Sequence, residues 1–392
     1  MSNRGRTLLR SSSTSALFRL VLLCLVPACG SASVAHPIVP IRTLEELQDF
    51  VSRAKGGETA QLQPGFSGPL IFTDFNPSNS VTITASKSDN IVVSVVKVTK
   101  SKNIRFVGLR LGRDLLQGEP AYFSHAVVRD SSRVSFEKCS FQGGSGRQPA
   151  ENGIGVNAIK STNLKIAGSS FTNLRLGATA NFSQNVVISE NRFQGIGVDG
   201  IVMAQVADLS VVGNTFSDWA SFDTPAHPDA IQFMTAGTSE SSSRIRIEDN
   251  IIIQGSGRVF QGIFFRDEKG NLPFTDIVVR NNFILSDQWN GITVQHGRNV
   301  SISWNTVVSS SGANVTNRIW LKNIERGSVC YNVADAYIFD SASVMRRRNQ
   351  VGKKVNTSKV LRSGPQGMDL RELSRSDIGY QPGAIPRGCL DE

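Results

Sequence analysis

Short runs in which apolar and polar residues alternate recur along the chain, and each run ends at a polar corner residue. Nine copies follow one another from residue 103 onward, beginning with NIRFVGLRL (103–111). Alternation predicts β-strands, because successive side chains of a strand point to opposite faces. The shortest spacing between corner residues is 22 residues, which leaves room for about three short strands and their turns. In the last six copies the corner residue is asparagine: Asn191, Asn214, Asn250, Asn282, Asn305 and Asn332.

Coils of this length, separated by insertions of variable size, are typical of a solenoid whose parallel strands stack about 4.8 Å apart. We predict an all-β chain folded as a parallel β-helix of about ten coils. Asparagine suits the corner because it tolerates the left-handed backbone conformation. Its stacked amides are expected to hydrogen-bond from coil to coil. A β-sandwich would instead need Asn-Gly or Asp-Gly hairpin turns at short regular intervals, and the chain does not show them.

The pattern divides the chain into three segments. Residues 1–35 carry four arginines before and around an apolar stretch and end in small residues, which predicts a secretory signal peptide cleaved before His36. Lipoprotein processing that leaves a lipidated Cys29 is the alternative. Residues 36–340 form the predicted β-helix domain, opened by a short capping helix from the capping box at 43–46 to about Ala54. Residues 341–392 are predicted to be a basic capping tail.

Charge and cysteine content narrow the function. The net charge of +10 favours an acidic partner. Export argues against nucleic acid, and no helix-turn-helix or aromatic RNA-binding motif is present. No later segment is apolar over a length that could span a membrane. We therefore expect a secreted or periplasmic monomer that meets an acidic polysaccharide. Cys139 is expected to be a buried free thiol, whereas Cys330 can meet Cys389 if the tail folds back.

A second phrase accompanies the first in each coil and predicts an outward-facing surface. Its third and fifth residues are expected in the core, and its second, fourth and sixth outside. Small residues at the second position predict a shallow trough, lined by Gln232, Arg266 and Lys322, that suits an extended chain ligand. The phrase reads Asp199-Gly-Ile-Val-Met, Asp229-Ala-Ile-Gln-Phe, Gln261-Gly-Ile-Phe-Phe, Asn290-Gly-Ile-Thr-Val and Asn317-Arg-Ile-Trp-Leu, with Asn152-Gly-Ile-Gly-Val as an earlier member.

The longest interval between corner residues contains the sharpest chemical signal, His227 held between two prolines. Histidine exchanges protons near neutral pH. Cleavage of a 4-linked uronate by β-elimination needs a neutralised carboxylate, removal of the C5 proton and protonation of the leaving oxygen. In this scheme Arg266 clamps the carboxylate, His227 is the base, and Asp229 orients the histidine or holds a cation, for which Ca²⁺ is the candidate although no Ca²⁺-loop motif is present. The remaining candidates are Lys322 and His296 as acid or subsite groups, Gln232 and Asp199 as substrate-binding groups, and Trp219 and Trp320 as sugar-stacking platforms.

Each of these residues also has a structural interpretation. Asp199 and Asp229 share a turn column and can simply bind corner backbone groups. His227 can anchor its loop, Lys322 can be a solvated surface residue, and His296 can belong to a turn. As competing chemistry, Asp199 and Asp229 lie on adjacent coils with backbones about 5 Å apart, a spacing that permits the carboxylate pair of a glycoside hydrolase. A non-catalytic glycan-binding β-helix is a further alternative.

These features together resemble the bacterial right-handed parallel β-helix proteins of the pectate-lyase-like superfamily, over about residues 40–340. Within that superfamily the chain looks most like the carbohydrate-active members, including alginate lyases, chondroitinase-B-like lyases and mannuronan C5-epimerases. The resemblance implies a lyase acting on an acidic polysaccharide, with C5 epimerisation as the nearest variant. The epimerases carry an Asp-Pro-His motif, whereas this chain has His227-Pro228-Asp229. The Asp-Asp pair and Gly-His-Gly motif of polygalacturonases are missing.

Overall fold

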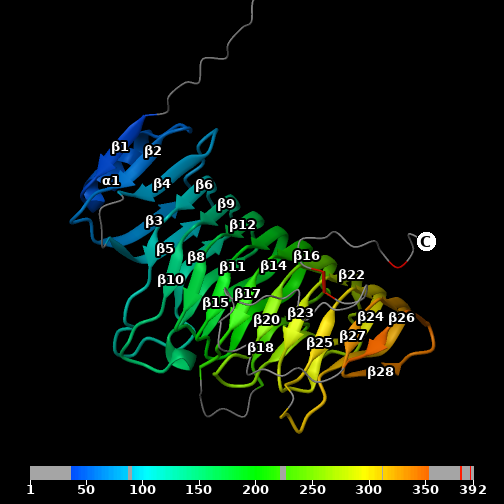
Figure 1. The fold of residues 1–392 in the computed structure, drawn as a ribbon. Helices are drawn as coiled ribbons and strands as arrows, with labels where there is room; N and C mark the ends of the chain where they lie inside the picture. Colours follow the sequence, from blue (N-terminus) through cyan, green and yellow to red (C-terminus); the bar gives the residue numbers. More distant parts are fainter. Residues whose placement is uncertain are drawn as a thin grey trace, which may run out of the picture. The chain divides into compact units, whose positions relative to one another are not determined.

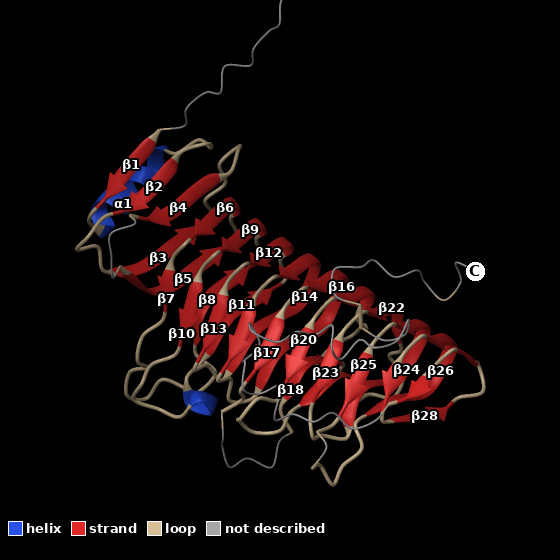
Figure 2. Cartoon of the chain, viewed as in Figure 1, coloured by secondary structure: helices blue, strands red, loops and turns tan. Residues whose placement is uncertain are grey.

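Parallel strands stack into three sheets, called here A, B and C, and from β6 onward each complete coil supplies a strand, or part of a long strand, to each sheet (Figures 1 and 2). The computed structural model describes residues 37–86, 91–220, 227–310, 312–352, 380, 381 and 389. Every pairing between named strands is parallel, as between β18 and β21 or β20 and β23. The predicted parallel β-helix is confirmed. The predicted signal peptide, with both of its cleavage alternatives, lies outside the described residues.

The strands of the three sheets follow the chain in order. Sheet A holds β3 (Gly68–Thr73), β5 (Val92–Thr99), β8 (Ser124–Arg129), β11 (Ile154–Ile159), the first halves of β14 (Leu176–Ser189) and β16 (Asp199–Val212), β18 (Asp229–Met234), β21 (Gln261–Arg266), the first halves of β24 (Asn290–Ser303) and β26 (Arg318–Cys330), and β28 (Ala336–Asp340). Sheet B holds β1 (Ile38–Ile41), β2 (Thr59–Leu62), β4 (Val81–Ala85), β6 (Lys102–Val107), β9 (Ser132–Glu137), β12 (Thr162–Ala167), the second halves of the four long strands, β19 (Ser243–Glu248), β22 (Phe274–Arg280) and β29 (Val344–Arg347). Sheet C holds β7 (Arg110–Leu111), β10 (Ser140–Gln142), β13 (Ser170–Thr172), β15 (Arg192–Gln194), β17 (Thr215–Ser217), β20 (Ile251–Ile253), β23 (Phe283–Leu285), β25 (Thr306–Val308), β27 (Val333–Ala334) and β30 (Gln350–Val351).

The capping helix forms where its capping box predicted it. Helix α1 spans Leu44–Arg53, and the Thr43 side chain accepts a hydrogen bond from the backbone N–H of Glu46. Leu47 and Phe50 are its buried residues, and both belong to the main hydrophobic core. The helix therefore covers the apolar interior that the first coil would otherwise leave open.

An asparagine ladder joins the coils at the corner between sheets B and C. The side-chain amide of each ladder residue donates to the side-chain oxygen of the next, at 2.9–3.0 Å from Asn191 through Asn332. Asn332 continues the ladder to Asn349 at 3.0 Å. One prediction about this corner is wrong: the left-handed conformation belongs to the residue before each asparagine, such as Glu190 or Asn281, and not to the asparagine itself. Asparagine is therefore selected here for its paired donor and acceptor, which repeat at the strand spacing.

Interior side chains at equivalent positions of successive coils stack on one another. Four phenylalanines of sheet C stack in near-parallel pairs with ring centroids 4.6–4.8 Å apart: Phe141, Phe171, Phe193 and Phe216. This distance matches the strand spacing, so identical side chains in successive coils stack without adjustment. Cys139 is a buried free thiol, as predicted, and burial raises its pKa to about 11.

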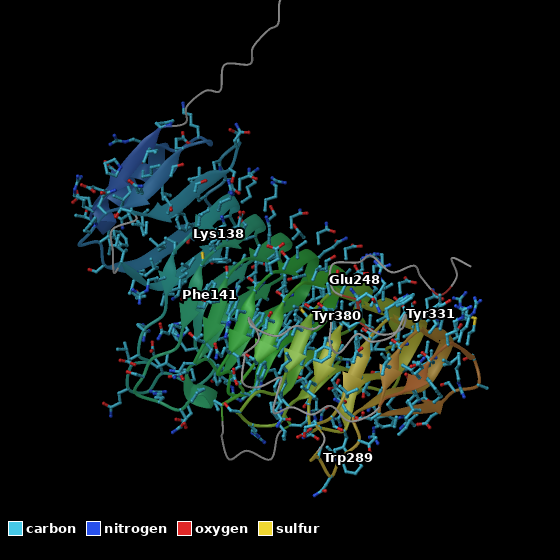
Figure 3. The ribbon with its side chains drawn as sticks, in the orientation of Figure 1. Lys138, Phe141, Glu248, Trp289, Tyr331 and Tyr380 are labelled. Atoms are coloured by element: carbon cyan, nitrogen blue, oxygen red, sulfur yellow. A yellow bond between two sulfur atoms is a disulfide. The ribbon has the colours of Figure 1, made fainter. Side chains whose placement is uncertain are left out.

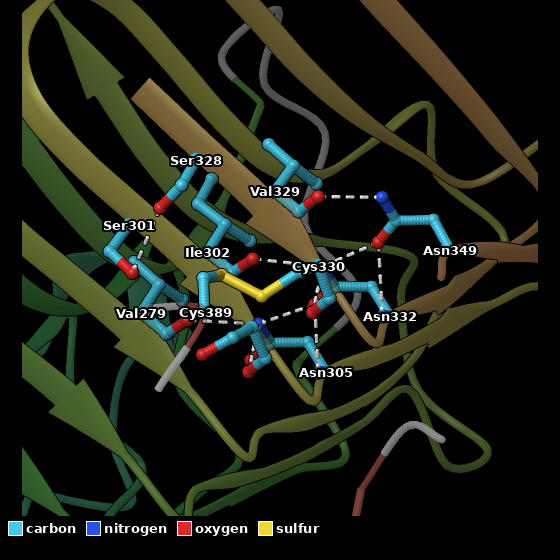
Figure 4. Close-up of a disulfide and its surroundings, with 11 residues drawn as sticks. Val279, Ser301, Ile302, Asn305, Ser328, Val329, Cys330, Asn332, Asn349 and Cys389 are labelled. Atoms are coloured by element: carbon cyan, nitrogen blue, oxygen red, sulfur yellow. Dashed lines mark hydrogen bonds between the residues drawn. A yellow bond between two sulfur atoms is a disulfide. The ribbon is translucent and has the colours of Figure 1, made fainter. Parts of the chain in front are cut away.

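The described part of the C-terminal segment packs back onto the β-helix. Cys330 and Cys389 form a disulfide beside the end of the asparagine ladder, with Cα atoms 5.9 Å apart (Figure 4). Tyr380 packs against Phe283 and its neighbours on sheet C (Figure 3), and its backbone N–H donates to Thr306 Oγ1 at 3.0 Å. Strands β29 and β30 lie beyond residue 340, within the segment predicted to be a capping tail.

Candidate active site

His227 and Asp229 meet where the chain enters sheet A from the loop that follows β17. His227 Nδ1 lies 3.2 Å from Asp229 Oδ2, the His227 side chain is 38% exposed, and the Asp229 side chain is fully buried. The carboxylate therefore sits behind the imidazole, whose other edge can face solvent. Residues 221–226 of this loop, which include Asp223, lie outside the described residues.

Asp199 occupies the equivalent position one coil earlier. Its Oδ1 accepts a hydrogen bond from the backbone N–H of Asp229 at 2.8 Å, which is the corner-binding role considered for this column. Burial raises the pKa of both carboxyl groups, and the neighbouring charge of Asp229 raises that of Asp199 further. Since both groups are buried, the pair cannot reach a glycan lying on the surface.

The imidazole of His227 is held in a polar and aromatic setting. Its contact with Asp229 raises the pKa of His227, and this contact outweighs the opposing effect of burial. The positive charge of Arg266, which lies two residues beyond Phe264 in β21, acts in the other direction. The ring of Phe264 meets the imidazole edge-on, with centroids 5.4 Å apart. A histidine fixed on two sides in this way can exchange a proton at a defined position.

Register aligns the residues of sheet A in the predicted columns, but not every member of a column faces outward. Gln232 pairs with Phe264, Phe264 with Thr293, and Thr293 with Trp320. The next column contains Met234 beside Arg266 and Gln295 beside Lys322. Arg266 and Lys322 are exposed, whereas Phe264 and Thr293 are buried. Two cationic side chains therefore project from the same column, two coils and about 10 Å apart.

The predicted trough does not arise from the small residues at the second position of the phrase. A Cβ atom added to Gly200 would come within 2.9 Å of the Phe216 ring, and one added to Gly177 within 2.5 Å of Phe193. These glycines therefore face the interior and make room for the phenylalanine stack. The earlier phrase at Asn152 is also misaligned, because Val156, and not Ile154, shares a column with Ile201.

A second histidine–carboxylate pair lies at the opposite end of the sheet A strands. His296 occupies the left-handed turn position between sheets A and B, with φ 68°, and its Nδ1 lies 2.7 Å from Asp267 Oδ2. Burial works against ionisation of Asp267, but hydrogen bonds from His296 and Thr235 outweigh it and lower its pKa. His296 also lines a cleft of about 410 Å³ together with Arg298, Glu325 and Asp340 among others. The sequence placed His296 near the site but gave no sign of its partner Asp267.

The two tryptophans predicted as sugar-stacking platforms lie in different environments. Trp219 is only 1% exposed, stacks on Phe260 at 4.0 Å and donates its Nε1–H to the Val198 carbonyl at 2.7 Å. It belongs to the core, and its assignment as a platform is wrong. Trp320 is partly exposed on sheet A, and its Nε1–H donates to Asp340 at 2.9 Å.

Arg318 and Trp289 join Trp320 at this surface, although the sequence did not single them out. The Arg318 guanidinium lies 5.5 Å from the Trp289 ring centroid and 5.1 Å from that of Trp320. A signal was present, because Arg318 is the one large residue among five second positions of the phrase occupied otherwise by glycine or alanine.

Within the described residues, no group of three or more His, Cys, Asp or Glu side chains is placed to hold a metal ion. In the same part of the chain, no helix has the length and apolar character needed to cross a membrane.

Several solved structures are similar to this chain at low sequence identity. The Dettilon tailspike protein is 16% identical with a TM-score of 0.50; the match covers 80% of this chain and 62% of the tailspike chain, so this chain spans less than two thirds of it. The Streptococcus pneumoniae surface adhesin PfbA is 12% identical over 81% of this chain and 83% of the adhesin, with a TM-score of 0.47. The PL6 family alginate lyase AlyGC is 12% identical over 81% of this chain and 52% of the lyase, with a TM-score of 0.48.

A search of curated protein sequences found no match. The family model for the right-handed β-helix region matches residues 75–222 and 124–275. The chain belongs to the right-handed parallel β-helix family.

Proposed function

We propose that this protein is an exported lyase that cleaves a uronate-containing acidic polysaccharide by β-elimination. One observation carries the proposal: a partly exposed imidazole, backed by the buried Asp229 carboxylate, lies edge-on against Phe264, two residues from the exposed Arg266 on the same strand of sheet A. Export follows from the predicted signal peptide at residues 1–35 and is tested by the N-terminal sequence of the mature protein. A start at a residue other than His36, or a lipidated Cys29, would correct it.

Each step of the β-elimination is assigned to a residue of the site. Arg266 neutralises the uronate carboxylate, which makes the C5 proton more acidic. His227 removes that proton through the nitrogen that does not face Asp229, the C4–O4 bond breaks, and a C4–C5 double bond forms. The leaving oxygen, on the carbon next to C5, takes its proton from Lys322, whose long side chain projects from the same column as Arg266. Because the base must be neutral, and Asp229 raises the pKa of His227, the rate rises with pH through that pKa.

The same geometry bears on the alternatives. Epimerisation shares removal of the C5 proton and differs in returning a proton to C5, so His227 and Arg266 would keep their roles. Hydrolysis by the Asp199–Asp229 pair is disfavoured, since both carboxyl groups are buried and Asp199 is committed to the backbone N–H of Asp229. A binding protein would need the cationic column of sheet A without proton transfer by His227.

A screen of acidic polysaccharides tests the proposal. Alginate, pectate, glucuronan and glycosaminoglycans are incubated with the protein at mildly alkaline pH while the ultraviolet absorbance of the new double bond and the number of reducing ends are followed. A lyase raises both signals together on at least one polymer. Reducing ends without absorbance would show a hydrolase, a change in uronate configuration alone an epimerase, and binding with no change in the polymer would leave only a glycan-binding protein. Each of these three outcomes overturns the lyase assignment.

A further inference from the structure

An arginine lies between two tryptophans on the C-terminal coils of sheet A. The guanidinium of Arg318 is within cation–π distance of both indoles, at 5.5 Å from the Trp289 centroid and 5.1 Å from the Trp320 centroid. Trp289 is 55% exposed and stands on the loop that leads into β24 (Figure 3). The cluster of Trp289, Arg318 and Trp320, called here the Trp–Arg platform, therefore presents aromatic surface and positive charge together.

A β-bulge aims Arg318 outward. The pairing of β24 with β26 shifts register between Asn290 and Ile292, so that Arg318 pairs with Asn290 and Gly291 is the extra residue. The preceding members of this column are small and face the core, so without the bulge a long side chain would have no room. Bulges of this kind re-aim side chains at functional surfaces. Asp340 fixes the Trp320 indole through its Nε1–H.

Polar atoms in and beside the platform lack hydrogen-bond partners within the described residues. Among the described residues, the Arg318 side chain makes a single long hydrogen bond of 3.4 Å, to Asn290, and no carboxylate pairs with it. Its buried Nε and the fully buried Oγ1 of Thr293, which pairs in register with Trp320, have no hydrogen-bond partner within that part of the chain. Buried polar atoms are normally paired. A guanidinium fixed between two aromatic faces and free of any counter-ion is suited to a planar carboxylate on a ring that can stack.

We propose that the Trp–Arg platform is a remote subsite that binds a uronate residue of the polysaccharide. This inference rests on the substrate class of the proposed function and adds a place where the chain is held. Strand β26 lies three coils after β18, about 14 Å from it, so one chain of several sugars would occupy the platform and the His227–Asp229 pair at once. Arg318 binds the carboxylate there, while Trp289 and Trp320 contact the sugar faces.

Titration calorimetry on the full-length protein tests the subsite. Uronate oligosaccharides of increasing length are compared with the same oligosaccharides after reduction of their carboxyl groups to alcohols, in a His227→Ala background that prevents turnover. We expect Arg318→Gln to weaken binding of the long uronate oligosaccharides about 10-fold or more. Binding of the reduced oligosaccharides should stay nearly unchanged. Trp289→Ala should weaken both, because stacking does not depend on the carboxylate. Arg105→Gln, an equal change of charge on sheet B, is the matched control.

The outcomes separate this inference from the lyase assignment. If no polymer gives a double bond but long uronate oligosaccharides bind in an Arg318-dependent way, the lyase assignment fails and the subsite stands. If cleavage occurs while Arg318→Gln binds every oligosaccharide like its parent, the subsite is wrong. Equal losses for uronate and reduced ligands would remove the carboxylate from the proposal and overturn it. Thermal unfolding of each variant shows whether a loss of binding reflects a loss of fold.

Discussion

The two corners at the ends of sheet C are built in opposite ways. At the corner with sheet B, every turn from β6 onward is short, and each ladder asparagine pairs with the next through side chain and backbone. At the corner with sheet A the loops vary in length, and buried polar atoms such as Asn317 Oδ1 and Asp335 Oδ1 lack a partner among the described residues. Asp229 belongs to the second kind, because its 3.2 Å contact with His227 is close but poorly aligned for a hydrogen bond.

The difference shows that, within one repeating coil, one corner stabilises the fold and the other holds groups available for binding or catalysis. Buried polar groups that are fully paired repay their desolvation, and a ladder of them fixes the register of successive coils. Groups left unpaired or charged in the interior cost stability, and they persist where a ligand or a reaction uses them. We therefore expect substitutions at the first corner to affect folding and those at the second to affect activity.

The largest expected effect is the loss of turnover in His227→Ala. Removal of a general base lowers the rate by about 10³-fold, while the half-exposed position predicts little change in thermal unfolding. Arg266→Ala should act similarly. His296→Ala is the comparison variant, because His296 also contacts a carboxylate, Asp267, at 2.7 Å, and we expect a smaller loss from it. The measurement is the initial rate of double-bond formation. If His296→Ala abolishes turnover and His227→Ala does not, the base is at the other end of the strands.

Replacement of a ladder asparagine should act on stability alone. Asn282→Ala removes the amide that accepts from Asn250 and donates to Asn305 and leaves those neighbours unsatisfied, so we expect a cost of about 3 kcal/mol in the free energy of unfolding. Asn181→Ala is the matched control, since Asn181 is partly exposed and outside the ladder. Urea denaturation followed by circular dichroism measures both. Equal stability of the two variants would mean that the ladder contributes no more than a surface amide.

The sequence predicts a corner feature only where the same residue type recurs at the same position of successive coils. The ladder was predictable, because identical residues at the strand spacing must meet and asparagine can both donate and accept. The residue in the left-handed conformation was not, since Glu190, Trp304 and Tyr331 hold that position without a shared sequence. Asn349 was missed because the last coil is degenerate.

The candidate site was predictable only in part, because it depends on departures from the repeat. His227 and Asp229 are near in sequence, and the strand entrance brings them together. Trp219 was misassigned, because the position of a loop does not determine whether its side chain turns into the core. Arg318 owes its direction to a bulge, which depends on one extra residue in the facing strand, and its own strand marks it only by a large residue where the other second positions hold glycine or alanine.

The smallest expected effect concerns the dependence of stability on pH. Asp199 is buried and its pKa is raised, so between the ordinary aspartate pKa and the raised one the folded protein holds a proton that the unfolded chain releases. Folding stability therefore falls as pH rises through that window.

Asp199→Asn keeps an oxygen for the Asp229 N–H but cannot ionise. We expect it to equal the wild type at acidic pH and to exceed it by about 1 kcal/mol at alkaline pH. Denaturation at both pH values measures this, with Asn282→Ala as the comparison, because the ladder contains no titrating group and its cost should be independent of pH. If the difference in stability between Asp199→Asn and the wild type does not change with pH, ionisation of Asp199 does not destabilise the folded protein. The two corners would then differ only in their hydrogen bonding.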